Sequence, residues 1–143
     1  MKTLKSLFAV LVLLHGSVSV AQSVPEGIHK PGDGSADICG LKAKTVADLQ
    51  SLVVAAADAE VLDVTPFYNA YALNQSLRQL TFTTPANRAH PAVACRAVVD
   101  DPARGSSVNT EIVCHNTREN CDWLYREFEA LTASTLRKME GRD

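Results

Sequence analysis

The four cysteines are the residues with the most distinctive chemistry in this 143-residue chain. Cys39, Cys95, Cys114 and Cys121 could either bind a metal ion or form two disulfides. Zinc sites favour cysteines two to four residues apart and a reducing compartment that keeps the thiols free. These cysteines are spaced more widely, and their number is even. The sequence therefore predicts two structural disulfides, with no metal and no cofactor.

Four cysteines allow three pairings. A hairpin that turns at residues 104–105 places Cys95 opposite Cys114, which favours a bridge between these two. Directly opposed cross-strand bridges are often strained, so we favour a second arrangement. In it, Cys114–Cys121 joins the last strand to the last helix, and Cys39–Cys95 ties the N-terminal segment to the sheet. A redox role requires a Cys-x-x-Cys pair, which the sequence does not contain.

Two histidines are the candidates for general acid–base chemistry. His90 precedes Pro91 in a long loop that also holds Arg88, and His115 follows a predicted strand that contains Glu111. A hydrolase needs a nucleophile on a glycine-flanked turn or two carboxylates across a cleft, and the sequence shows neither pattern. We therefore predict no catalytic residue, and we expect His90 to hydrogen-bond a backbone carbonyl. A small hydrolase that uses His90, His115 and Glu111 remains the alternative.

The elements that must position these residues predict an α+β fold. Thr45 and Asp48 have the spacing of a capping box, and apolar residues recur behind them at helical spacing. Runs of β-branched, aromatic and leucine residues follow, separated by turn formers. The expected fold is an N-terminal helix over 46–59, a four-stranded antiparallel meander over 64–73, 77–83, 92–99 and 107–114, and a long C-terminal amphipathic helix over about 117–139.

The predicted hairpin register also assigns the two faces of the sheet. Because side chains alternate along a strand, Cys95 and Cys114 share one face, which we expect both helices to cover. The other face then carries Arg96 and Glu111, which are close enough to pair diagonally. With the loop residues, this face gives a predicted binding surface of Arg88, His90, Arg96, Val98, Glu111, Val113 and His115.

The first residues have the pattern of a secretory signal. Lys2 and Lys5 precede an apolar run over 7–14, and Ser19 and Ala21 stand at the −3 and −1 positions of a peptidase site. The run is about half the length of a membrane-spanning helix. The expected organisation is a signal peptide over 1–21, a flexible leader over 22–38 and a single domain over 39–143.

The charge of the exported chain limits its partners. Removal of residues 1–21 takes away two of the 14 basic residues and none of the 16 acidic ones, so the net charge becomes about −4. Nucleic acids and anionic membranes require concentrated positive charge, so we expect neither as a partner, and no stable membrane anchor after signal cleavage.

These observations predict a periplasmic or secreted, disulfide-bonded protein-binding domain whose partner is another protein. One concrete form is an inhibitor or immunity protein against a cell-envelope-acting enzyme. The alternatives are the small envelope hydrolase and an assembly factor of a secretion or envelope complex.

Overall fold

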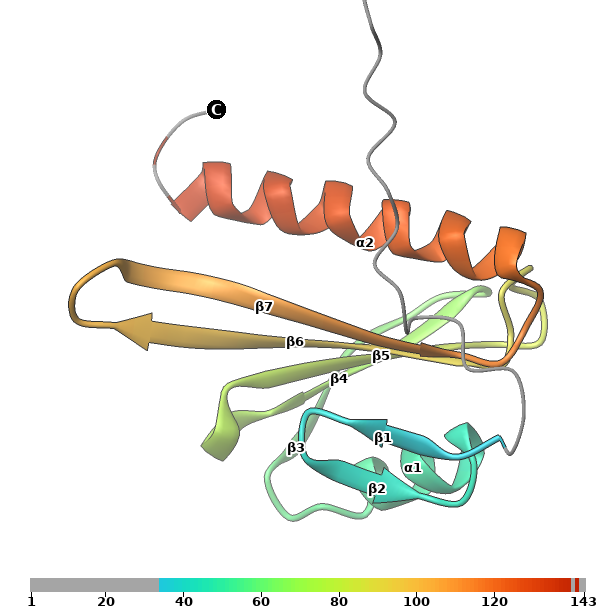
Figure 1. The fold of residues 1–143 in the computed structure, drawn as a ribbon. Coiled ribbons are helices and arrows are strands. Elements are labelled where there is room, and N and C mark those ends of the chain that lie inside the picture. Colours follow the sequence, from blue (N-terminus) through green and yellow to red (C-terminus); the bar gives the residue numbers. More distant parts are fainter. Residues whose placement is uncertain (1–33, 140, 142–143) are drawn as a thin grey trace, which may run out of the picture.

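The computed structural model describes residues 34–139 and 141, arranged as two helices and two antiparallel sheets (Figure 1). The predicted signal peptide and residues 22–33 of the predicted leader lie outside the described residues. Within the described part, no helix combines the length and apolar character needed to cross a membrane. The elements are β1 (Ala36–Ile38), β2 (Leu41–Ala43), α1 (Val46–Val54), β3 (Ala59–Val64), β4 (Tyr68–Leu73), the 3-10 turn η1 (Asn74–Ser76), β5 (Arg78–Thr83), β6 (Ala92–Asp101), β7 (Gly105–Cys114) and α2 (Arg118–Met139).

The main sheet is a meander of five strands in the order β3-β4-β5-β6-β7, in which every neighbouring pair is antiparallel. The predicted α+β class is confirmed, and so is the long C-terminal helix. The expected four strands are five, because an additional strand, β3, occupies residues 59–64, nearly all of which precede the predicted sheet. A second sheet of two strands, β1-β2, takes the N-terminal position that we expected for the first helix.

The predicted strand over 64–73 is shorter than expected and begins only at Tyr68, because a turn occupies its first residues. Thr65 Oγ1 accepts hydrogen bonds from the backbone N–H groups of Phe67 (3.2 Å) and Tyr68 (2.9 Å), so the chain reverses around Pro66. Pro66 therefore belongs to this turn. The predicted helix over 46–59 also ends early, at Val54, because the chain turns through its alanine run and enters β3.

The expected flexible leader overlaps a strand. Ala36 and Ile38 of β1 are each only 1% exposed, and both belong to the core. Between β1 and β2 the chain reverses at Cys39 and Gly40, both with positive φ. The apolar side chains on either side of this turn are few, so the segment had too little hydrophobic pattern to predict a hairpin.

The turn between β6 and β7 differs from the predicted one and shifts the whole hairpin. Arg104 N–H donates to Asp101 O (3.1 Å), and Gly105 has a φ of 84° and pairs with Asp101. The loop is therefore centred on Ala103 and not on residues 104–105. This displaces the register by three residues, an odd number, which moves one strand's side chains to the opposite face.

The corrected register separates residues that we expected to share a face. Cys95 now pairs with Glu111, so these two lie on one face, whereas Cys114 lies on the other. Arg96 shares the face of Cys114 and cannot form the predicted diagonal pair with Glu111. Val113, expected on an exposed face, is buried beside Cys95.

Each face of the main sheet carries its own core, and the two helices lie on opposite sides (Figure 1). The expectation that both helices cover one face is therefore wrong. On the α1 side, α1 and the β1-β2 hairpin pack against the strands of the main sheet. The continuous core that they form includes Leu49, Val53, Tyr71, Leu80, Phe82, Val93, Cys95 and Val113. On the α2 side, the buried residues of the second cluster are Ala89, Ala92, Ala94, Ile112, Cys114, Cys121, Leu124 and Phe128.

The disulfides are the pair that we favoured, and no cysteine is free. Cys39–Cys95 joins the β1-β2 turn to β6, and Cys114–Cys121 joins the end of β7 to the first turn of α2. Each bridge therefore fastens one of the two covering layers to the main sheet.

Candidate functional site

The covering of the sheet is incomplete on the α2 side. The helix contacts β7, and its buried residues belong to the cluster formed with β6 and β7. The α2-side face of β3, β4 and β5 is left beside the helix, where a trough runs between strands and helix. We call this trough the α2 groove.

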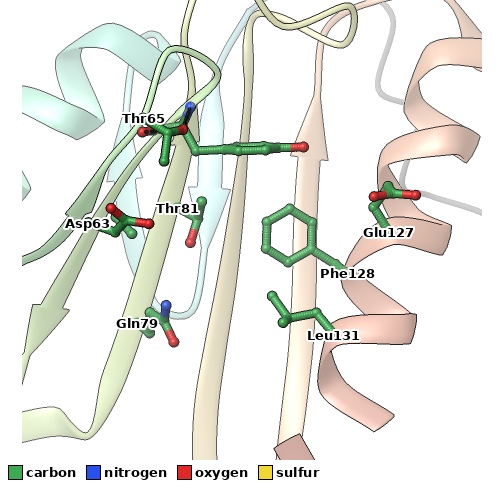
Figure 2. Close-up of a pocket in the computed structure, with 9 residues that line it drawn as sticks. Asp63, Thr65, Gln79, Thr81, Glu127, Phe128 and Leu131 are labelled. Atoms are coloured by element: carbon green, nitrogen blue, oxygen red, sulfur yellow. Dashed lines mark hydrogen bonds between the residues drawn. The ribbon is translucent and has the colours of Figure 1, made fainter. Parts of the chain in front are cut away.

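The central section of the α2 groove has a volume of about 290 Å³ (Figure 2). Figure 2 shows Phe128 and Leu131 projecting from the helix towards the strands. The ring of Tyr68 meets the ring of Phe128 edge-on, with centroids 6.2 Å apart. The exposed surface of the lining is largely apolar and aromatic, and polar groups project from both walls. The complete lining is Asp63, Thr65, Tyr68, Ala70, Gln79, Thr81, Glu127, Phe128 and Leu131.

Two further hollows continue the groove at its ends. One, of about 380 Å³, shares Tyr68 and Glu127 with the central section and reaches Trp123. The other, of about 280 Å³, shares Gln79 and reaches Thr135. The helix rises about 1.5 Å per residue, so the stretch from Trp123 to Thr135 is about 18 Å long. At about 3.3 Å per extended residue, this length accommodates about five or six residues of an extended chain.

The central section of the groove is acidic. Asp63 and Glu127 line it, and Glu60 lies on the same face of β3 as Asp63 because their strand partners share a face. Among the described residues, none of the salt bridges involves these three carboxylates. Burial raises the pKa of Tyr68, and the nearby charge of Glu127 adds to the rise, while a hydrogen bond with Asn87 opposes it.

The two ends of the groove carry arginines. At one end, the Arg88 guanidinium lies 5.3 Å from the centroid of the Trp123 ring. At the other, Arg96 donates from Nη2 to Gln79 Oε1, and burial lowers the pKa of Arg96. Its Nε is buried and has no hydrogen-bond partner among the described residues. A buried N–H without an acceptor costs free energy, so this end of the groove holds an unsatisfied donor.

The histidines lie away from the α2 groove. His90 and His115 line a separate hollow of about 340 Å³ near the start of α1. His90 Nδ1 donates to Thr83 O (2.9 Å), and His115 Nε2 donates to Ser35 O (2.8 Å). These contacts agree with the carbonyl hydrogen bond that we expected for His90.

Glu111 does not join this pair. It precedes His115 by four residues, which is about 13 Å along a strand. Its carboxylate accepts the backbone N–H of Cys39 (2.8 Å). The three residues of the hydrolase hypothesis therefore do not converge on one point.

The structure divides the predicted binding surface into three parts. Arg88, Arg96 and Val98 line the ends of the α2 groove. Glu111 and Val113 lie on the opposite face of the sheet, and the two histidines line the hollow beside α1. The centre of the groove was absent from the prediction, although Phe128 and Leu131 belong to the predicted C-terminal amphipathic helix.

Within the described part of the chain, no three histidine, cysteine, aspartate or glutamate side chains gather in a way that could hold a metal ion. Comparison of the chain with models of protein families, with curated proteins and with solved structures finds no match.

Proposed function

We propose that this chain is an exported, disulfide-bonded protein-binding domain, and that the α2 groove holds an extended segment of its protein partner. The observation that carries the proposal is the groove's form. It is a continuous open trough about 18 Å long, with an aromatic and aliphatic floor and a few polar groups at fixed places. Recognition sites combine these features, because apolar contact supplies affinity and sparse polar groups set orientation.

The two disulfides support the export that this function requires. Bridges persist in oxidising compartments and are rare where thiols are kept reduced, so the pair is consistent with the periplasm or the extracellular space. The acidic centre of the groove and the net negative charge favour a basic partner, since complementary charge accelerates association. An inhibitor or immunity protein against a cell-envelope-acting enzyme fits this description.

A matched pair of substitutions tests the role of the groove. Leu131 and Leu52 are both helical leucines that are about half exposed, at 47% and 58%, but Leu52 lies on α1, on the other side of the sheet. Leu131→Arg places a cation and a larger side chain in the groove, whereas Leu52→Arg makes the same change elsewhere. With the mature domain as bait in extract of the exporting compartment, we expect wild type and Leu52→Arg to retain the same protein and Leu131→Arg to lose it. Equal retention by both variants would show that the partner binds outside the groove.

The hydrolase alternative predicts a different result. Replacing both His90 and His115 by alanine should leave partner retention unchanged if the domain acts by binding. A lost general base typically lowers a rate by about 10²-fold or more, so an enzyme would lose its biological activity. A double variant that folds and retains the partner, yet has no biological activity, would favour the hydrolase.

A further inference from the structure

The outer strand β3 forms an exposed apolar edge of the main sheet. Its last five residues are all exposed, and they include Val61 (61%), Leu62 (47%) and Val64 (65%). β3 pairs only with β4, so the backbone groups on its other side have no strand partner among the described residues. An edge of this kind is a template for another strand, and proteins usually protect it with charge, bulges or a covering segment.

The opposite edge of the sheet, at β7, shows such protection. The β1 segment contacts β7, and the backbone N–H of Cys39 donates to the Glu111 carboxylate. The exposed positions of β7 also carry no large apolar side chain; they are Gly105, Ser106, Ser107, Asn109 and Glu111. One edge is thus flanked and polar, whereas the other is exposed and apolar.

A β-bulge places the acidic and the apolar side chains of β3 on opposite faces of the sheet. The register shifts at Leu62, so Glu60 and Asp63, three residues apart, both lie on the α2 side of the sheet. Val61 and Val64 lie together on the α1 side for the same reason. The bulge therefore gives the edge an acidic face beside the α2 groove and an apolar face on the other side.

This arrangement distinguishes between possible occupants of the edge. Antiparallel pairing of β3 with β3 of a second copy would place the acidic faces of both strands on the same side, and like charges across neighbouring strands are destabilising. A strand with basic residues on that side would instead pair with Glu60 and Asp63. Its alternate residues would cover Val61 and Val64.

We propose that β3 is a docking edge that adds one strand from a partner protein, and that this strand alternates basic with apolar residues. The proposal rests on the protein-binding function and specifies its partner. Main-chain hydrogen bonds to β3 would supply affinity, and the alternating side chains would supply selectivity. The basic side chains of the added strand would lie on the groove side of the sheet, next to Asp63.

A synthetic peptide of alternating lysine and valine, about seven residues long, tests the proposal with the intact mature domain. An added strand donates and accepts hydrogen bonds only through alternate residues. Two N-methylated peptides, blocked at the odd or at the even amides, must therefore differ. We expect one to bind like the parent and the other to bind at least tenfold more weakly, and the parent to slow amide exchange in residues 59–64.

Protein variants provide the matched charge control. Glu60→Lys with Asp63→Lys should weaken peptide binding at least tenfold, whereas Glu129→Lys, an exposed change of α2 outside the groove, should leave it unchanged. Equal binding by both methylated peptides, concentration-dependent dimerisation of the domain through β3, or no binding at about 1 mM peptide would each overturn edge docking. Peptide protection confined to Phe128 and Leu131 would also overturn it. These results leave the proposed function standing, because groove binding and the hydrolase alternative are tested separately, by partner retention of Leu131→Arg and by the activity of the double histidine variant.

Discussion

The two faces of the five-stranded sheet are covered to different extents. On the α1 side, a helix and a hairpin close over the strands, and the fully buried Leu49, Leu80 and Phe82 lie in one layer. On the α2 side, a single helix covers β6 and β7 and leaves the α2 groove above the other strands. The α1 side therefore contains the more completely covered core, whereas the α2 side leaves part of the sheet open beside the helix.

The disulfides should show the largest difference between the faces. Cys39–Cys95 closes a separation of 56 residues, and Cys114–Cys121 closes one of 7. In the loop-entropy model, removing the first bridge by paired alanine substitution should lower the free energy of unfolding by about 4 kcal/mol, and removing the second by about 2.5 kcal/mol. Urea denaturation of both double variants measures this. An equal or inverted ranking would show that the α1 side does not dominate stability.

Truncation of an apolar side chain should also lower the free energy of unfolding more on the α1 side than on the α2 side, with smaller losses than removal of a disulfide. Leu80→Ala removes a fully buried side chain on the α1 side and should lower the free energy of unfolding by about 3 kcal/mol. Leu131→Ala removes a half-exposed side chain from the groove and should cost about 1 kcal/mol or less. Thermal and chemical denaturation would compare the two variants. A loss at Leu131 as large as that at Leu80 would mean that the groove is part of the core.

The smallest effect should appear at alkaline pH. Because burial raises the pKa of Tyr68 above its ordinary value of 10.0, the folded state holds the phenol proton more tightly than the unfolded state. This contribution is complete below pH 10 and is lost as the pH rises through the folded pKa. Tyr68→Phe should therefore weaken the alkaline decline in unfolding free energy, measured by denaturation across that range. An unchanged slope would show that the phenol of Tyr68 is hydrated in the folded state.

Local signals in the sequence were sufficient for several elements. The first turn of α2 follows Thr117, whose Oγ1 accepts the backbone N–H of Asn120 (3.4 Å), and the basic residues Arg137 and Lys138 occupy its last turn. A helix with caps and a 3.6-residue apolar stripe is specified within its own residues. The cysteine pairing was also predictable, because Cys114 and Cys121 flank a strand-to-helix connection.

The register of a hairpin, which depends on the number of residues in its turn, was not predictable in the same way. The Asp101–Gly105 turn is centred on Ala103, whereas the expected turn was centred between residues 104 and 105. That difference still exchanged the faces of Glu111 and Val113 with respect to Arg96. Likewise, the hydrogen bonds of Thr65 form a turn where we expected the start of a strand.

The candidate site was predictable only at its margins. Arg88, Arg96 and Val98 were expected on a binding surface, and they line the ends of the groove. The centre depends on how far α2 reaches across the strands. That distance is set by tertiary packing and leaves no pattern within either segment.

The position of the second disulfide has a mechanical consequence for the groove. Cys114–Cys121 fixes the first turn of α2 to the end of β7, and beyond it the helix continues for another 18 residues to Met139. Any tilt of the helix relative to the strands must pivot near this anchor, so displacement grows along the helix. The groove therefore has a stiff end near Trp123 and a compliant end near Thr135. If the groove holds a partner as proposed, bulky side chains are best accommodated at the compliant end, where small rotations widen the space most.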